Sequence, residues 1–209
     1  MNKHLKHILV FIVFFLAASQ IFSASNDDKL KAFSESISYE EIGNYNKAFE
    51  IINSYYKKDS DDYLTTLRLG WLKYLQKDYN ESIKYYNKAV KLSSESIESL
   101  LGITYPYSAL NKWDEIKAVY KKILKKDEYN YTANLNLGQI YLNTQDYLNA
   151  RSYLENVYNN YPSDLSANVY LGWTYYYLGN KTKANYLFTN ALISDKTNSS
   201  AIEGLNLTR

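Results

Sequence analysis

Histidine and cysteine, which often perform catalysis or bind metals, are absent from this sequence after residue 25. Both histidines, His4 and His7, lie within the first 25 residues, and the chain contains no cysteine. The rest of the chain therefore lacks the commonest general base, a thiolate nucleophile and the nitrogen and sulfur ligands of a zinc site. Adjacent acidic residues occur at Asp61-Asp62 and Asp127-Glu128, where they fit turns and helix caps. We therefore predict that the protein is not an enzyme and binds no cofactor, metal or small-molecule substrate.

The elements that position the remaining side chains recur every 34 residues. A residue type that caps helix N-termini stands at six successive steps, and its side-chain oxygen can accept a hydrogen bond from a free backbone N–H. A second series, 16 residues later, is broken only by Lys112. The first series is Asp28, Asp62, Ser96, Asn130, Asp164 and Asn198, and the second is Asn44, Asp78, Asp146 and Asn180. Each 34-residue interval is therefore predicted to contain two helices.

Small and large residues follow the same period inside these intervals. Position 8 holds Ser36, Gly70, Thr104, Gly138 and Gly172, position 20 holds Ala48, Ser82, Ile116, Ala150 and Ala184, and position 24 holds Ile52, Tyr86, Tyr120, Leu154 and Phe188. This pattern resembles the tetratricopeptide repeat over nearly all of the chain after residue 28. The resemblance implies an all-α, right-handed superhelical solenoid of five helix-turn-helix units plus a C-terminal capping helix. The units are residues 29–62, 63–96, 97–130, 131–164 and 165–198, and the capping helix is residues 199–209.

In proteins of this family, the first helix of each repeat lines a concave groove. The resemblance implies that positions 2, 5, 9 and 12 face this groove, roughly one helical turn apart. Trp and Tyr are typical anchors of interfaces, and exposed apolar patches usually mark interaction sites. We therefore predict a partner-binding groove lined by Leu67, Trp71, Tyr74, Tyr105, Leu135, Leu142, Trp173, Tyr176 and Tyr177. The alternative is that these side chains pack against neighbouring first helices inside the wall of the array.

The first 25 residues have the pattern of a secretory signal peptide. Lys3 and Lys6 precede an uncharged apolar run from Ile8 to Ala18, and Ser23 and Ser25 fit a cleavage site. We expect a protein that is exported to the periplasm or secreted; the alternative is an uncleaved segment that anchors the chain in the inner membrane. Removal of the two lysines from a chain of net charge +2 leaves no basic surplus, so we expect no nucleic-acid partner.

These features together predict a non-catalytic scaffold for protein–protein interaction, which holds a partner peptide or helix in an aromatic-lined groove. Two alternatives stay open at this point. The protein could be a structural homo-oligomer that stacks end to end, because its C-terminal cap is short. It could also be a regulatory subunit of a cell-envelope enzyme.

Overall fold

A computed structural model describes residues 26–57 and 60–209 of the chain. All regular secondary structure within these residues is helical, so the all-α prediction is confirmed. None of the helices described is long and apolar enough to cross a bilayer. The predicted signal peptide, residues 1–25, lies outside the described residues.

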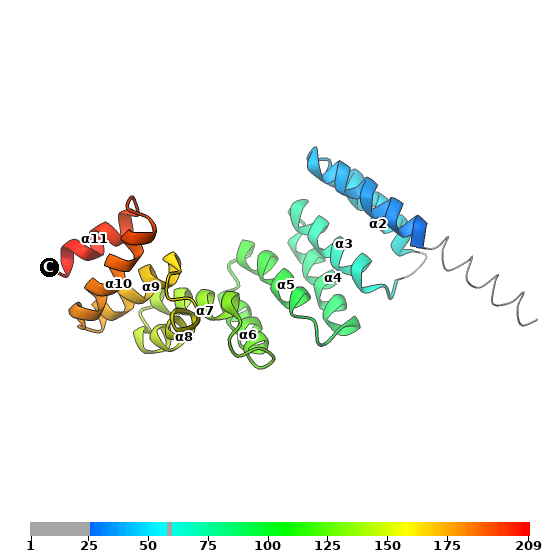
Figure 1. Ribbon diagram of the computed structural model, residues 1–209. Coiled ribbons are helices and arrows are strands. Elements are labelled where there is room, and N and C mark those ends of the chain that lie inside the picture. The colour runs from blue at the N-terminus through cyan, green and yellow to red at the C-terminus, as the bar shows by residue number, and fades with distance from the viewer. Residues whose placement is uncertain (1–25, 58–59) are drawn as a thin grey trace, which may run out of the picture. The chain divides into compact units, whose positions relative to one another are not determined.

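Within each repeat that lies inside one unit, a short turn joins two helices that run in opposite directions (Figure 1). The first helices of the predicted repeats begin at residues 63, 97, 131 and 165, where the 34-residue period places them. A helix over residues 26–41 is followed by α2 (Tyr45–Tyr56), α3 (Tyr63–Leu75), α4 (Tyr79–Leu92), α5 (Ile97–Ala109), α6 (Trp113–Leu124), α7 (Tyr131–Asn143), α8 (Tyr147–Asn160), α9 (Leu165–Tyr177), α10 (Lys181–Ser194) and α11 (Ser199–Leu207).

The chain divides into two compact units between α5 and α6. We call them the N-unit, Met1–Asn111, and the C-unit, Lys112–Arg209. This boundary lies inside the predicted repeat 97–130, so the two helices of that repeat belong to different units. The same repeat departs most from the pattern, since it carries Pro106 within α5 and Ile116 where the other repeats have Ala or Ser. The helix α5 nevertheless continues through Pro106 to Ala109.

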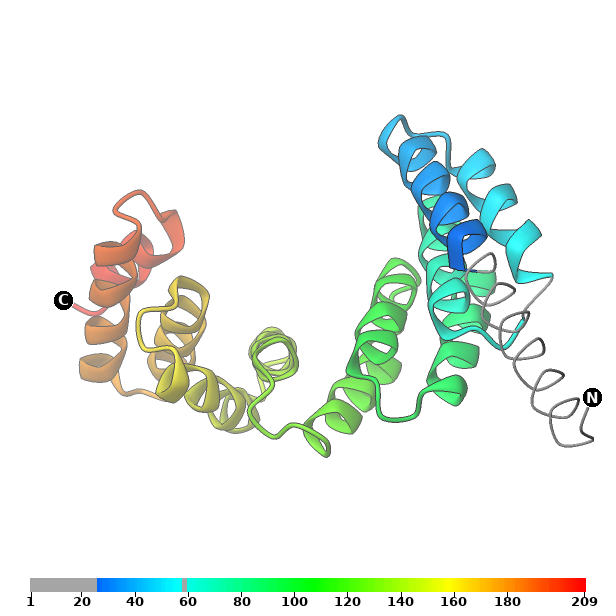
Figure 2. The ribbon, with the colours of Figure 1, turned by 45° about the vertical axis from the view of Figure 1, so that its right-hand side comes forward.

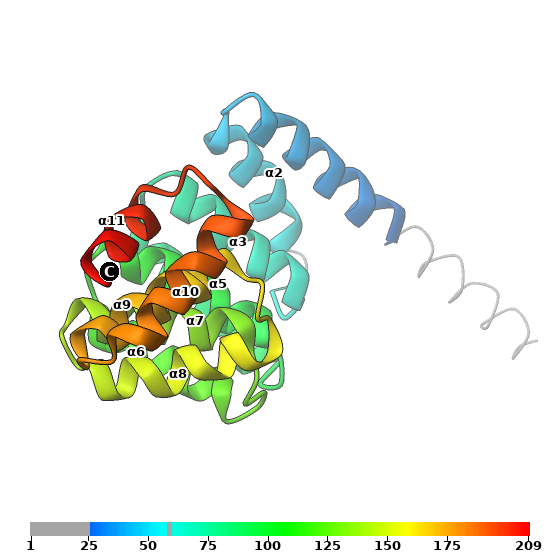
Figure 3. The ribbon, with the colours of Figure 1, turned by 60° about the vertical axis from the view of Figure 1, so that its left-hand side comes forward.

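Within each unit, helices pack in sequence order, and the first helices of neighbouring repeats also touch. In the N-unit α3 packs against both α4 and α5; in the C-unit α9 packs against α7, α8, α10 and α11. Figure 2 shows the helix pairs from one side, and Figure 3 shows α11 lying against α10. The predicted capping helix therefore packs against both α9 and α10.

Capping side chains begin most of the helices. Asp62, Asn130, Asp164 and Asn198 accept a hydrogen bond from the backbone N–H three residues later, as do Asn44, Asp78, Asp146 and Asn180 in the second series. The prediction for Asp28 is wrong, because residues 26 and 27 already belong to the helix 26–41. Ser96 starts α5 but makes no side-chain capping bond; its hydroxyl lies 2.7 Å from Oη of Tyr63 instead.

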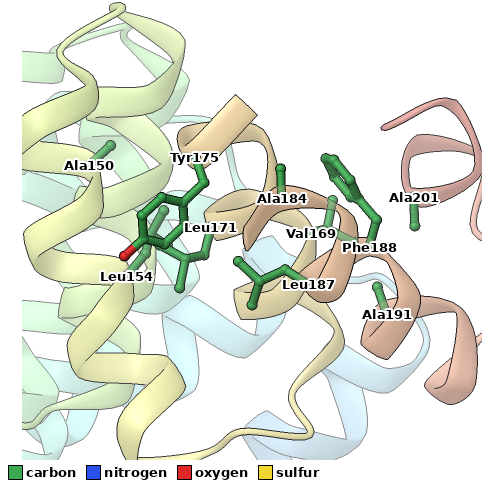
Figure 4. Close-up of a cluster of buried hydrophobic side chains, with 10 residues drawn as sticks. All are labelled: Ala150, Leu154, Val169, Leu171, Tyr175, Ala184, Leu187, Phe188, Ala191 and Ala201. Atoms are coloured by element: carbon green, nitrogen blue, oxygen red, sulfur yellow. The ribbon is translucent and has the colours of Figure 1, made fainter. Parts of the chain in front are cut away.

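A ring held between two glycines organises the packing of each unit. In the N-unit, Tyr86 lies between Gly70 and Gly102, and a Cβ added to Gly102 would come within 2.3 Å of the Tyr86 ring. In the C-unit, a Cβ on Gly204 would come equally close to Phe188, at 2.3 Å. Such distances are far inside van der Waals contact, so only glycine lets the helices approach this closely. Figure 4 shows the cluster of buried side chains that surrounds Phe188.

The turn between the two helices of each repeat contains one left-handed residue. Gly43, Lys77, Asn111, Gln145 and Gly179 occupy this place, with φ between 55° and 79° and a constant spacing of 34 residues. Around Lys77 the N–H of Asp78 donates to the carbonyl of Lys73 (2.9 Å), which closes the end of α3 in the usual left-handed manner. The residue that closes one helix is thus followed directly by the residue that caps the next.

Candidate functional site

A pocket of about 590 Å³ opens on the first-helix side of the N-unit. Four helices contribute to it, and most of the lining is apolar or aromatic. Because Gly102 has no side chain, the ring of Tyr86 reaches the pocket lining from α4 behind it. Burial raises the pKa of the Tyr86 phenol above its ordinary value. The lining residues are Phe33, Leu64, Leu67, Arg68, Trp71, Tyr86, Glu98, Leu101, Gly102 and Tyr105.

Three aromatic rings stand together at this N-unit pocket. The ring centroids of Trp71, Tyr74 and Tyr105 are 5.4 to 5.8 Å apart in all three pairs. The indole Nε1 of Trp71 donates to Oε1 of Glu40 (2.8 Å), which fixes the orientation of its ring. Tyr105 is the outermost ring, with 51% of its surface exposed.

The two buried charged side chains near these rings neutralise each other, and the exposed carboxylate of Glu98 accepts a hydrogen bond from Oη of Tyr63 (3.2 Å). Arg68 Nη2 lies 2.5 Å from Glu40 Oε2, and both side chains are mostly buried. Arg68 Nη2 also donates to Oγ of Ser36 (3.3 Å). An incoming apolar group would therefore meet a charge pair that is already compensated.

A second pocket, of about 540 Å³, opens in the C-unit. Its aromatic wall is a short stack, in which Tyr177 lies 4.9 Å from Tyr147 at an interplanar angle of 15° and 5.9 Å from Trp173 at 28°. The indole Nε1 of Trp173 donates to Oγ of Ser200 in α11 (2.7 Å). The lining residues are Leu142, Asn143, Gln145, Tyr147, Tyr170, Trp173, Tyr177, Ser200 and Glu203.

The predicted groove residues are distributed between these two places. Leu67, Trp71 and Tyr105 line the N-unit pocket, with Tyr74 beside them; Leu142, Trp173 and Tyr177 line the C-unit pocket. Leu135 and Tyr176 line neither pocket and pack against the hydrophobic core of the C-unit. Both tryptophans fit the groove prediction and also its alternative, packing inside the wall. Each indole N–H bonds to a neighbouring helix, while its ring lines a pocket.

Several lining residues were missed by the prediction, although the sequence held a signal for most of them. Positions 2 and 5 were assigned to the groove in the five repeats but were not carried into the C-terminal tail. There they correspond to Ser200 and Glu203, both of which line the C-unit pocket. Gln145 lies in the turn before α8, where helical periodicity gives no information. Tyr86 was identified only as a packing residue.

Comparison with known proteins agrees with the fold and the period. Sequence models of the tetratricopeptide repeat match residues 67–96, 107–164 and 135–199. The chain contains tetratricopeptide repeats. Helices α4 and α6–α10 lie within the matched residues, so most of the C-unit, which holds the second pocket, is built from these repeats.

Two curated relatives share part of these tetratricopeptide repeats. A repeat-containing protein of Methanocaldococcus jannaschii is 34% identical over 112 residues, which are 54% of this chain and 33% of that protein. The RNA polymerase-associated protein CTR9 of Caenorhabditis elegans is 27% identical over 104 residues, which are 49% of this chain and 9% of that protein. The chain therefore matches only a third or less of the length of these relatives.

Solved tetratricopeptide structures resemble the chain over most of its length. A protein from Parabacteroides merdae gives a TM-score of 0.74 at 16% identity, covering 87% of this chain and 72% of the other. MamA gives 0.69 at 18% identity (82% and 93%), and YrrB, described as having an unusual peptide-binding site, gives 0.68 at 15% identity (90% and 97%). At these identities the likeness establishes the fold alone.

Tetratricopeptide repeats are typically non-catalytic and generally act as scaffolds that bind proteins or peptides. Within residues 26–57 and 60–209, no three His, Cys, Asp or Glu side chains converge in a way that could hold a metal ion. What the two pockets present is aromatic surface together with a few hydrogen-bonding groups, which suits binding rather than bond breaking.

Proposed function

We propose that the N-unit pocket binds a partner peptide or helix by taking up one of its apolar or aromatic side chains, and that the protein acts as a non-catalytic scaffold. The observation that carries this proposal is Tyr105, which stands half exposed at a mostly apolar pocket whose buried charge, on Arg68, is already paired with Glu40. A ring in this position can close over an inserted side chain without breaking any bond within the N-unit.

The expected energy is adequate for a weak, reversible interaction. Covering about 100 Å² of apolar surface on Tyr105 at ~25 cal/mol/Å² contributes about 2.5 kcal/mol before association costs. Trp71 and Leu67 add surface deeper in the pocket. Several such contacts correspond to affinities of about micromolar, or roughly −8 kcal/mol.

Selection of peptides from a displayed random library against the purified protein tests the proposal. We expect the selected peptides to share an apolar or aromatic anchor, and we expect Tyr105→Ala to weaken their binding about 30-fold, or ~2 kcal/mol. Fluorescence anisotropy with labelled peptides gives the dissociation constants.

The matched control is Tyr129→Ala, because Tyr129 is another exposed tyrosine (60%) that lines neither pocket. The control should leave the affinity unchanged. Equal weakening by both variants, or selected peptides that ignore Tyr105, would refute the N-unit pocket as the binding site.

End-to-end assembly is the second candidate, and one observation favours it. Ile202 and Leu207 on the last helix are 42% and 44% exposed, an apolar surface on which a second copy could stack. Sedimentation velocity at several concentrations separates the candidates, since a monomer at all concentrations removes self-assembly. Ile202→Lys is expected to abolish any dimer that forms through this surface.

Export is part of the proposal and rests on the composition of residues 1–25 alone. Intact-mass analysis of the protein isolated from cell-envelope and secreted fractions tests it. A chain that begins after Ser25 supports cleavage and export, whereas a full-length chain in the membrane fraction would support the anchored alternative.

A further inference from the structure

Three polar side chains of the C-unit pocket have no partner within the described residues. Asn143, Gln145 and Glu203 are exposed, and their side chains make no hydrogen bond or ion pair within residues 26–57 and 60–209. In the N-unit pocket, by contrast, Arg68 pairs with Glu40, and Glu98 accepts a hydrogen bond from Oη of Tyr63 (3.2 Å). The C-unit pocket therefore presents free hydrogen-bonding capacity beside an aromatic wall.

The charge of this pocket is also one-sided. Glu203 is the only residue of its lining that is charged at neutral pH. Ser200 and Tyr170 already accept hydrogen bonds, from Trp173 Nε1 (2.7 Å) and Gln139 Nε2 (2.9 Å), so their hydroxyl protons remain available to an acceptor. A ligand that satisfies the whole lining needs an apolar part, a cationic group and a carbonyl.

We infer that the C-unit pocket binds a lysine or arginine side chain of a partner segment. Lysine and arginine combine a long apolar stem with a charged head, so the stem can lie along Tyr177 and Trp173 while the head pairs with Glu203. The side-chain amides of Asn143 and Gln145 can bond the backbone of an extended segment on either side of that residue. The inference extends the proposed peptide binding to a second pocket with a different preference.

The test uses small probes, so that it does not depend on knowing the natural partner. N-acetyl-lysine methylamide is titrated into ¹⁵N-labelled protein while the indole N–H signal of Trp173, assigned with Trp173→Phe, is followed by NMR. The matched probe is N-acetyl-norleucine methylamide, which keeps the apolar stem and lacks the charge. We expect saturable millimolar binding of the lysine probe and at least about fivefold weaker binding of the norleucine probe.

Variants then assign the charge. Glu203→Gln should weaken binding of the lysine probe about fivefold, as expected for a half-exposed ion pair. Glu128→Gln, which removes an exposed carboxylate elsewhere in the C-unit, should change nothing. Equal binding of both probes, no binding of either, or no effect of Glu203→Gln would overturn the inference; the first of these outcomes would identify a purely apolar pocket.

The inference and the proposed function fail separately. Tyr105→Ala should leave the lysine probe unaffected, because Tyr105 does not line the C-unit pocket. Binding of the lysine probe without any Tyr105-dependent peptide would refute the N-unit proposal alone. Tyr105-dependent peptides without lysine binding would refute the inference alone.

Discussion

The N-unit and the C-unit use the same packing device and place different chemistry next to it. In each unit one aromatic ring packs between two glycines. In the N-unit Tyr86 packs between Gly70 and Gly102, and in the C-unit Phe188 packs between Gly172 and Gly204. Tyr86 reaches the lining of the N-unit pocket, whereas Phe188 is fully buried and does not line the C-unit pocket. The ring between two glycines therefore determines how closely the helices pack, and the residues around that ring determine what each unit can bind.

The largest expected effect comes from removing the packed ring of the C-unit. Phe188→Ala deletes a fully buried ring and leaves a cavity between α9, α10 and α11, so we expect the C-unit to lose about 3–5 kcal/mol of stability. Urea unfolding followed by circular dichroism measures the loss. Tyr186→Ala removes an exposed ring two residues earlier and should cost far less. Equal effects would mean that Phe188 does not hold these helices together.

Adding one methyl group to a glycine tests the same packing by crowding the ring instead of removing it. Gly102→Ala would place a Cβ 2.3 Å from the Tyr86 ring, and we expect a loss of about 1–3 kcal/mol from overpacking. Gly70→Ala is the matched variant on the same ring, where the Cβ would lie 3.2 Å away. There the better helix propensity of alanine, about 1 kcal/mol, offsets the milder contact. Equal unfolding midpoints for the two variants would contradict the close packing of the Tyr86 ring against Gly102.

Substitutions at the N-cap of the second helix of a repeat should have smaller effects on stability, and the two substitutions below should have opposite signs. Asp146 caps α8, whereas Lys112 begins α6 without a side-chain capping bond. Asp146→Ala should therefore cost the C-unit about 1 kcal/mol, and Lys112→Asn should stabilise it by roughly 0.5–1 kcal/mol. Thermal unfolding of both variants checks the signs, and stabilisation by the first or destabilisation by the second would be inconsistent with the caps seen here.

The smallest expected effects are on the pH dependence of stability. The first residue of a repeat bonds to its last residue through different groups in the two units. Lys29 Nζ pairs with Asp62 (2.6 Å), and Tyr131 Oη donates to Asp164 (2.9 Å). Partial burial acts against ionisation of Asp62, but hydrogen bonds from Lys29 and Thr65 outweigh it and lower its pKa. Burial, together with the bond to Asp164, raises the pKa of Tyr131 to about 12.

The two signs are opposite. The contribution of Asp62 is present above the ordinary carboxyl pKa of about 3.9 and is lost as the pH falls through its lowered value. The contribution of Tyr131 is complete below pH ~10 and is lost as the pH rises through about 12. Urea midpoints across pH should become flatter in acid for Asp62→Asn, which keeps a capping residue, and flatter in alkali for Tyr131→Phe. Unchanged profiles would argue against both contacts.

Much of the fold follows from the sequence because the helix starts carry their own chemistry. Capping oxygens place α3, α7 and α9, and the residues at position 24 are buried, from Ile52 to Phe188. The left-handed turns were not predicted, since Lys77 and Gln145 are not residues that signal a positive φ, and asparagine, as at Asn111, signals it less strongly than glycine. Asp28 was misassigned because a capping residue type also occurs inside helices.

The candidate site was only partly predictable. Helical periodicity identifies which side chains share a face, and Trp71 and Trp173 do reach pockets. Periodicity cannot show that Leu135 turns to the core, which depends on how neighbouring helices pack. Nor can it show whether a carboxylate is paired, because the partner of Glu40 lies 28 residues away on the next repeat, whereas Glu203 has no partner among the described residues.

The left-handed turns have a consequence for engineering and for the growth of such proteins by gene duplication. In each hairpin a left-handed residue is followed at once by the cap of the next helix, or by Lys112 in its place, so the chain can be cut and rejoined at the same point in every module. A segment such as residues 112–145 or 146–179 begins and ends at equivalent backbone geometry. Copying or deleting such a segment changes the number of modules without creating a new kind of junction.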